Sequence, residues 1–314
     1  MISPISKERF LGCLLGHAVG DGVGAPFEGL SSDLIYNSFG RAGEIVAKPP
    51  VERLFYTDDT QMMIGLAEVL LAHGEVDEEM LLRTFATNYD PKRGYGPGTR
   101  QLLESLPAHG DWRAACKAIF PEGSFGNGGA MRVSPVGLLF CEDLDRVAAE
   151  ADRSAAPTHA HPLGVEGARL MAVAVALAVR EPVFDKAAFY SQLWRYAREE
   201  EFRWQIRLAA QLGEHDGLST LGNSLESHRS VMTAIACFTS TPESYSRTIA
   251  RAIAQGNDTD TLAAMAGALS GAHLGVGAIP VNLLELLEDE VKGRTYIRSL
   301  AEQLHGSYVR TFNA

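Results

Sequence analysis

Apolar residues recur at helical spacing along almost the whole of this 314-residue chain. Between residues 6 and 19, Phe10, Leu14 and Ala18 fall four positions apart and so share one face of a helix. The same spacing predicts further helices over residues 60–73, 78–88, 98–106, 112–120, 129–139, 144–155, 162–179, 186–198, 203–212, 231–239, 243–255, 261–274 and 283–304. No alternation typical of a strand extends beyond four residues. We therefore expect an all-α fold.

Nothing in the sequence marks a boundary between domains. It contains neither a low-complexity linker nor a change in composition, which predicts a single compact orthogonal multi-helix domain over residues 1–314. Glycine and proline mark expected loops at residues 20–26, 95–97, 123–129 and 275–280. Alanine and glycine abound within 168–178 and 263–272, where small side chains let buried helices pack closely.

Composition limits where the protein works and what it binds. A formal net charge of -11 argues against nonspecific binding along a nucleic-acid backbone, which needs an excess of basic residues. Residues 1–7 contain no apolar leader, and the longest apolar run, 170–179, falls short of the roughly 18 residues of a membrane span. The cysteines are scattered, as expected of buried free thiols in a reducing cytosol: Cys13, Cys116, Cys141 and Cys237. We expect a cytoplasmic monomer without membrane contact.

Two acidic runs carry the first chemical signal. Thr57-Asp58-Asp59 and Asp258-Thr259-Asp260-Thr261 each stand at the start of an apolar helix. Neighbouring residues on a regular helix point about 100° apart, so their side chains converge only where the helix begins. Threonine and aspartate are also ordinary N-cap residues, so the first run alone fits either capping or metal binding.

The pair of runs is more informative than either one. If the two helix starts face each other, they supply four carboxylates and two hydroxyls, which would repel one another without cations between them. Neither run contains Cys or His, and oxygen ligands alone favour Mg²⁺ or Mn²⁺ over zinc. The runs therefore predict a site for two divalent cations.

Glycine-rich segments suggest the rest of a site. The segment 20–28 could present Glu28 inward, although a solvated loop carboxylate is the alternative. Residues 124–132 open a helix, and free N–H groups there would suit a diphosphate, unless the segment is a plain turn. Tyr95 lies on a bent loop, where it either lines a pocket or only turns the chain. His159 and His161 precede Pro162, a spacing that does not fit a zinc helix, so we favour a hydrogen-bonding or substrate-lining His159 over a metal ligand.

Together these segments resemble the ADP-ribosylglycohydrolase family, which includes the dinitrogenase-reductase-activating glycohydrolases and the ADP-ribosyl-serine hydrolases. The matching stretches occur in the order typical of that family: residues 12–16, 20–24 with Glu28, 56–60, 126–132, 158–159 and 256–261. The sequence of residues 221–223 is also similar to that of the family. The resemblance covers the chain from its first helix to about residue 275.

The resemblance implies an all-helical fold with a binuclear magnesium site and an ADP-ribose cleft. By carry-over, the metal ligands are Thr57, Asp58, Asp59, Asp258, Asp260 and Thr261. The implied catalytic residues are Glu28, Asp58, Asp59, Asp258 and Asp260. The implied substrate-binding residues are Tyr95, Gly96, Ser124, Phe125, Gly126, Asn127, Gly128, Gly129, Met131 and His159.

The implied reaction is hydrolysis at ribose C1″ of an ADP-ribosyl group, with cations that fix the ribose and activate water. The substrate would be a serine- or arginine-linked ADP-ribosylated protein, or O-acetyl-ADP-ribose. Residues 56–60 and 126–132 look nearest the serine-directed branch, whereas Gly29-Leu30 after Glu28 departs from it, so the leaving group stays open. The alternatives are a catalytically silent ADP-ribose-binding module and a prenyl-transfer enzyme, which would want an aspartate where Met62 stands.

Overall fold

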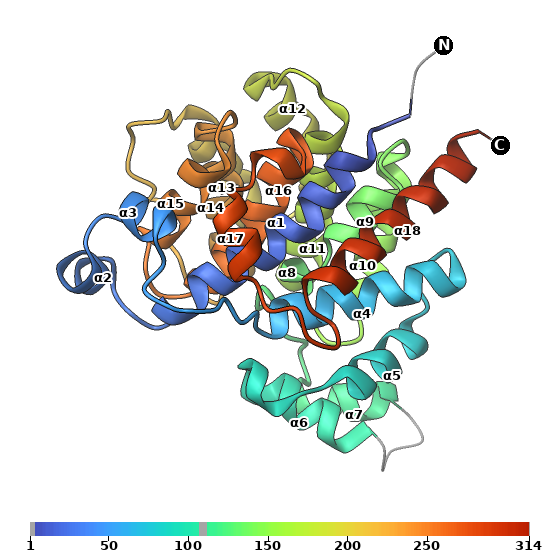
Figure 1. Cartoon of the computed structure of the whole chain (residues 1–314). Coiled ribbons are helices and arrows are strands. Elements are labelled where there is room, and N and C mark those ends of the chain that lie inside the picture. The colour runs from blue at the N-terminus through green and yellow to red at the C-terminus, as the bar shows by residue number, and fades with distance from the viewer. Residues whose placement is uncertain (1–3, 107–111, 314) are drawn as a thin grey trace.

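The computed structural model describes residues 4–106 and 112–313, which form a bundle of helices crossing at many angles (Figure 1). Within those ranges the β-type pairings outside helices are isolated bridges, Ser31–Gly256, Leu54–Leu287 and Gly126–Glu226. The predicted all-α class is therefore confirmed. Residues 1–3, part of the segment in which we found no leader, lie outside the described residues.

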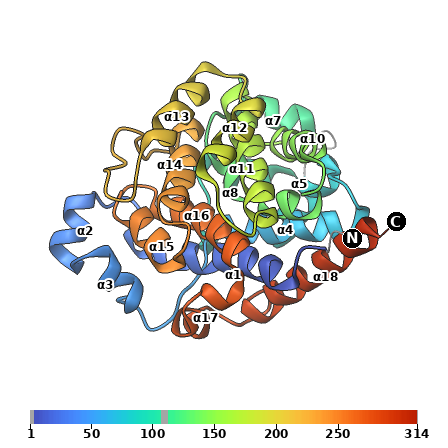
Figure 2. The same cartoon turned by 90° about the horizontal axis from the view of Figure 1, so that it is seen from above.

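Two helices, α1 (Lys7–Gly24) and α16 (Thr259–Leu274), lie along each other at the centre (Figures 1 and 2). On α1 every fourth residue of the contacting face is glycine: Gly12, Gly16, Gly20 and Gly24. A Cβ on Gly12 would stand 2.2 Å from the carbonyl oxygen of Gly271, and one on Gly20 would stand 2.1 Å from that of Ala263. The two backbones thus touch directly, which no residue larger than glycine would allow at these positions.

This contact corrects our prediction of a loop over residues 20–26. The chain stays helical to Gly24 and then tightens into a 3₁₀ turn, η1 (Ala25–Phe27). Glycine and proline there indicated a turn, but Gly20 and Gly24 instead allow the backbone of α16 to pack directly against α1. The helix consequently carries its last turn directly into the region where the acidic runs lie.

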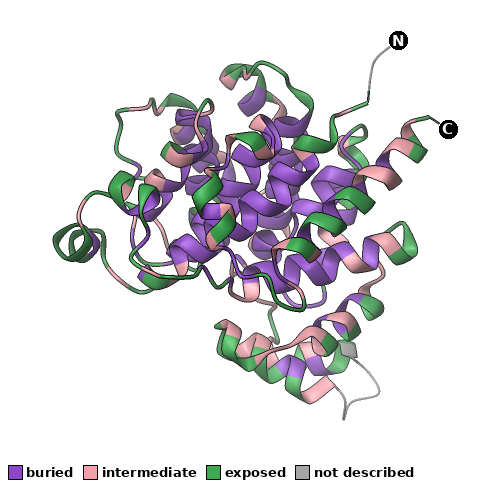
Figure 3. Ribbon diagram, in the orientation of Figure 1, coloured by how far each residue is buried: buried purple, intermediate pink, exposed green. Residues whose placement is uncertain are grey.

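The neighbouring helices enclose this central pair, and Figure 3 shows that buried residues concentrate around it. α16 contacts α8 (Gly128–Met131), α11 (Pro162–Arg180), α14 (Ser227–Ser240) and α15 (Tyr245–Ile253). α1 contacts α4 (Asp58–His73), α9 (Ser134–Leu139) and α18 (Arg294–Phe312). Tyr245 fixes α15 to the pair, because its hydroxyl donates to the Gly16 carbonyl at 2.6 Å.

The remaining helices are peripheral. α2 (Ser32–Phe39) and α3 (Ala42–Ala47) project at one edge, and α5 (Glu78–Asn88), α6 (Pro97–Ser105) and α7 (Trp112–Ile119) form a group beside α4 (Figure 1). The others are η2 (Pro91–Arg93), α10 (Leu144–Ala155), α12 (Lys186–Tyr196), α13 (Glu200–Gln211), η4 (Val276–Ala278) and α17 (Val281–Leu286). The sequence did not predict α2 or α3.

Two predicted helices are divided in the structure. The stretch 129–139 forms α8 and α9, with Arg132 and Val133 between them. The stretch 283–304 forms α17 and part of α18, because the chain leaves the helix at Leu287, where it pairs with Leu54. Leu54 donates to the Leu286 carbonyl and accepts from the Glu288 N–H, both at 2.9 Å. A tertiary pairing with a distant residue thus ends the helix, and local spacing could not reveal it.

One described helix, α11, is long and apolar enough to cross a membrane by length and composition. Of its apolar stretch, 83% is buried inside the protein. The apolar segment therefore extends further than the run 170–179 that we identified. α11 packs against α8, α9, α10, α14 and α16, which is the environment of a core helix.

The four cysteines are free, as predicted. Cys13, Cys141 and Cys237 are buried, whereas Cys116 is half-buried, so the expectation of complete burial is wrong for that thiol. Cys116 lies on the peripheral helix α7, which explains its exposure. The organisation into a single domain stays a prediction.

Substituting Gly12→Ala should destabilise the fold by about 2–3 kcal/mol, because the new methyl group would overlap the Gly271 carbonyl of α16. Gly43→Ala is the matched control: nothing lies within 4 Å of its Cβ position in α3, so the free energy of unfolding should stay equal or rise by up to about 1 kcal/mol. Urea unfolding measures both. Equal stability of the two variants would contradict direct backbone contact.

Candidate active site

A cleft of about 1140 Å³ gathers residues from distant parts of the chain. Most of the predicted site residues line it: Glu28, Asp58, Asp59, Tyr95, Gly96, Ser124, Phe125, Gly126, Asn127, Gly128, Met131, His159, Asp258, Asp260 and Thr261. Thr57 and Gly129 do not line it. Thr57 caps α4, and Gly129 is buried against Ala155 and His159.

The two acidic runs meet at this cleft. The Thr261 hydroxyl donates to Asp59 Oδ2 at 3.4 Å, across 202 positions of sequence. Thr57 donates to the same oxygen at 3.3 Å and accepts from the Asp59 N–H, so capping and convergence occur together. The starts of α4 and α16 therefore face each other, as the sequence predicted.

Asp21 holds the start of α4 in place, and sequence reasoning missed it. Its fully buried carboxylate accepts hydrogen bonds from the Thr57 N–H (3.0 Å), the Thr60 N–H (3.1 Å) and the Thr60 hydroxyl (2.5 Å). The carboxylate thereby takes up donors that the start of a helix leaves free. The sequence does show an aspartate inside an apolar, glycine-rich stretch, which is typical of a buried polar role. Because we predicted a loop there, we did not assign Asp21 such a role.

The start of α16 is fixed by a turn with a left-handed residue. Asn257 has a φ of 58°, the left-handed region that non-glycine residues seldom adopt. Its N–H donates to the Leu30 carbonyl at 2.7 Å, and its own carbonyl accepts from the Gly29 N–H at 2.8 Å. This pairing ties the residues after Glu28 to the residue before Asp258, which brings the exposed Glu28 carboxylate to the rim of the acidic cleft.

The carboxylates perturb one another strongly. Burial, with the nearby charges of Asp21 and Asp260, raises the pKa of Asp59 well above its usual value. Burial and the charge of Asp258 do the same to the pKa of Asp260. Burial, and then Asp21, raise the pKa of Asp58 to about 8. Burial and Asp258 also raise the pKa of Glu28. Without a counter-charge, this cluster opposes its own ionisation.

The described residues provide little of that counter-charge. None of the carboxylates of this cluster, Asp21 included, forms an ion pair with lysine or arginine in residues 4–106 and 112–313. Asp59 Oδ1 and Asp260 Oδ1 are buried without a hydrogen-bond partner, and Asn127 Nδ2 donates to Asp258 Oδ2 at 2.5 Å. Unpaired buried oxygens of this kind suit a hard divalent cation.

The carboxylate oxygens suit a divalent cation by their chemical type, but the structure does not show them in a preformed coordination geometry. Among the described residues, no three His, Cys, Asp or Glu side chains already stand in a metal-binding arrangement.

The loop that carries Tyr95 is braced by buried polar contacts. The hydroxyl of Tyr95, which is 2% exposed, donates to Gln61 Oε1 at 2.8 Å. Just before the loop, Arg93 forms a two-pronged ion pair with Glu288 and stacks on Tyr56, 3.8 Å from the ring centroid. Tyr95 is therefore a fixed wall of the cleft, and Gln61, which follows the first acidic run, sets its position.

The glycine-rich segment at 124–131 is less open than predicted. We expected a row of free N–H groups, but that of Gly126 donates to Ser124 Oγ at 3.2 Å and that of Asn127 to the Leu225 carbonyl at 3.0 Å. The prediction of successive free donors is therefore wrong at these two positions. Phe125 leaves its ring half exposed beside the cleft.

His159 and His161 have different roles, and neither joins a metal cluster in the described residues. His161 caps α11 by accepting from the Leu163 N–H at 3.2 Å. His159 is buried and lines the cleft, with Nδ1 2.8 Å from the Thr158 hydroxyl. The sequence prediction of hydrogen bonding by His159 thus agrees with the structure.

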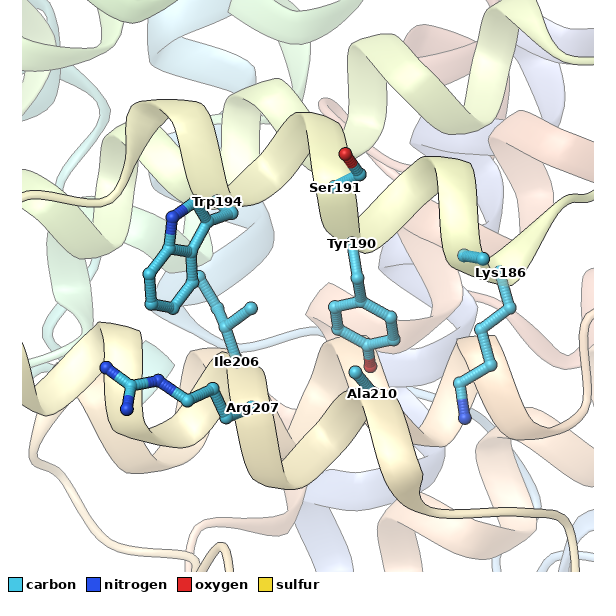
Figure 4. Close-up of a pocket in the computed structure, with 8 residues that line it drawn as sticks. Lys186, Tyr190, Ser191, Trp194, Ile206, Arg207 and Ala210 are labelled. Carbon is cyan, nitrogen blue, oxygen red and sulfur yellow. The ribbon is translucent and has the colours of Figure 1, made fainter.

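A second cavity, of about 520 Å³, lies between α12 and α13. Figure 4 shows Trp194 and Tyr190 of α12 facing Arg207, Ile206 and Ala210 of α13. The Arg207 guanidinium lies 5.1 Å from the Trp194 ring centroid, so the groove's aromatic wall already has a cationic partner. No carboxylate lines this cavity, and we place the chemistry in the acidic cleft.

Comparison with known proteins finds relatives along nearly the whole chain. The family model described as ADP-ribosylglycohydrolase matches residues 3–313. The ADP-ribosylhydrolase ARH3 of Mus musculus is 35% identical, covering 96% of this chain and 92% of the relative, and that of Homo sapiens is 34% identical with 96% and 93% coverage. A solved structure titled ADP-ribosylglycohydrolase-related protein complex superposes with a TM-score of 0.75 at 27% identity, covering 96% of this chain and 98% of that one.

Asp21→Ala should lower the free energy of unfolding by about 3 kcal/mol, because three buried donors at the start of α4 lose their acceptor. Glu52→Ala removes an exposed carboxylate instead and should change stability by less than about 0.5 kcal/mol. Denaturant titration of both variants measures the difference. A loss for Asp21→Ala no larger than for the control would contradict the anchoring role.

Proposed function

The chain belongs to the ADP-ribosylglycohydrolase family and is an ADP-ribosylhydrolase; from this premise we propose that it is a magnesium-dependent enzyme acting at its acidic cleft. The bond cleaved would be the glycosidic bond at ribose C1″ of an ADP-ribosyl group, with release of ADP-ribose. The observation that carries the proposal is the meeting of the two acidic runs, through Thr261 and Asp59, in a cleft large enough for a nucleotide.

The cations would be held by oxygen atoms alone. We propose Thr57, Asp58, Asp59, Asp258, Asp260 and Thr261 as the ligands of two Mg²⁺ ions, with Mn²⁺ as a possible substitute. Bound cations would supply Lewis acidity to the ribose hydroxyls and lower the pKa of a water. The unpaired Asp59 and Asp260 oxygens support this assignment.

The protein's own groups contribute in two further ways. Hydrolysis at C1″ passes through a state resembling an oxocarbenium ion, and carboxylates beside the cleft would stabilise the positive charge that develops there. Asn127 donates to Asp258 and so fixes the orientation of that carboxylate before substrate arrives. Glu28, at the rim and beside Asp258, is placed to orient the substrate or the attacking water.

Membership of the family supports ADP-ribosylated molecules as the substrate class. We propose serine- or arginine-linked ADP-ribosylated proteins or O-acetyl-ADP-ribose as substrates. Incubating the protein with each of the three linkages and quantifying free ADP-ribose by chromatography tests the proposal. Release from one or more supports it, whereas binding of ADP-ribose without release from any would identify a silent binding module instead.

Asp260→Asn should reduce ADP-ribose release by about 100-fold or more, because it removes one buried charge from the cluster while keeping the shape of the side chain. Asp33→Asn makes the same chemical change at an exposed first-turn position of α2 and should retain full activity. Turnover assays compare the two, and circular dichroism checks that both remain folded. Unchanged turnover in Asp260→Asn would remove the cluster from the mechanism.

Mg²⁺ should raise the melting temperature, and the increase should be larger at pH 8 than at pH 6. The pKa of Asp58 is raised to about 8 and that of Asp21 to about 6, so the native protein holds protons at pH 6 that a cation must displace. These raised values also mean that, without metal, the carboxyl groups favour the native state less as pH rises from 6 to 8.

The measurement is differential scanning fluorimetry with millimolar Mg²⁺ against EDTA at both pH values. A shift that is absent, or that is larger at pH 6, would be incompatible with cations binding to these carboxylates.

A further inference from the structure

Arg132 is a fully buried cation without a carboxylate partner. It lies between α8 and α9 and is 0% exposed, and in the described part of the chain it forms no ion pair. Its guanidinium donates to the carbonyls of Gly128 (3.0 Å) and Ser154 (2.8 Å) and to the Thr158 hydroxyl (2.7 Å). A buried charge held only by neutral groups is costly, which suggests a task beyond packing.

The contact with Thr158 sets the direction of the next hydrogen bond. A guanidinium can only donate, so the Thr158 oxygen accepts from Arg132 and its own proton must go elsewhere. Two acceptors are within reach: His159 Nδ1 at 2.8 Å and the Ala155 carbonyl at 3.5 Å. That carbonyl already accepts the N–H groups of Thr158 (3.0 Å) and His159 (2.8 Å). The hydroxyl therefore donates to Nδ1.

This bond decides the tautomer of His159. An imidazole that accepts at Nδ1 carries its proton on Nε2. Nε2 lies on the side of the glycine-rich segment, because a Cβ on Gly128 would stand only 2.8 Å from it. His159 lines the cleft, and no residue in 4–106 or 112–313 forms a hydrogen bond with Nε2. The ring thus has one free N–H donor at the wall of the cleft.

The electrostatic surroundings of His159 also favour a neutral ring. Burial and the neighbouring Arg132 cation lower the pKa of His159 to about 3, which keeps the ring neutral at physiological pH. A neutral ring with Nδ1 occupied is a single, oriented donor.

We propose that Arg132 and Thr158 are positioning residues that fix His159 as an Nε2–H donor to an oxygen acceptor of the bound ADP-ribosyl group. The identity of the ligand rests on the proposed function, whereas the tautomer is a property of the free protein. The role is one of recognition: the donor contributes to ligand affinity, and the relay from Arg132 through Thr158 prevents the ring from presenting an acceptor instead.

The first test is a long-range ¹H–¹⁵N spectrum of protein labelled at histidine nitrogen, with His159→Gln used to assign the signal. We expect the neutral Nε2–H tautomer for His159 between pH 6 and pH 8 in the ligand-free wild type. In Thr158→Val the ring should lose this preference and populate both tautomers, while Thr158→Ser, which restores the hydroxyl, should return the wild-type pattern. An Nδ1–H or imidazolium signature in the wild type would overturn the proposal.

The second test is calorimetric binding of ADP-ribose. Thr158→Val should weaken the affinity about 3- to 10-fold, the size expected for one hydrogen bond, and Thr158→Ser should stay within about 2-fold of wild type. A Thr158→Val protein with wild-type tautomer and affinity would contradict the relay. If that variant does not fold, the wild-type spectrum and the Thr158→Ser affinity still decide. If wild type binds no ADP-ribose, the proposed function fails separately from the tautomer.

Discussion

The direct contact of two helix backbones governs this structure. Along α1, glycine at every fourth position lets α16 approach until a Cβ would overlap its carbonyl groups. The last turn of α1 then carries Asp21 to the start of α4, while the contact places the start of α16 opposite. Asp260 lies on α16 itself, and Asp59 is joined to α16 by one hydrogen bond from Thr261. The placement of the two acidic helix starts is consequently a property of the core.

The core holds together charges that would otherwise separate. Burial, and then the charges of nearby carboxylates, raise the pKa values of Asp59 and Asp260, and each of the two has a buried oxygen without a hydrogen-bond partner. Such an arrangement destabilises the protein by itself, and the packing of helices supplies the compensating free energy. Such a cluster attracts positive charge, which the cations that we propose, or the oxocarbenium-like centre of a glycoside in hydrolysis, would supply.

Sequence reasoning succeeded where the signal was local and failed where a distant partner decided. Helical spacing predicted most helices, and the chemistry of Asp58 and Asp260 at helix starts predicted an acidic site. The same reasoning took the glycines after residue 19 for a loop, because a turn and a close helix contact use glycine for different reasons but look alike in sequence. Asp21 was missed as a consequence. The break near Glu288 was missed because the pairing with Leu54 is formed by residues far away in the chain.

By itself, the sequence determined the all-helical class, the family, and the residue types that meet at the cleft, since periodicity, ordered motifs and oxygen-rich runs are written in adjacent positions. Only the tertiary structure decided which groups act on one another. Asp21 became an anchor for α4, Gln61 a brace for Tyr95, and Arg132 a neighbour of His159 because separate segments packed together. The physical reason is that hydrogen-bond direction, burial and pKa depend on what surrounds a side chain, and surroundings are assembled from parts of the chain that are remote in sequence.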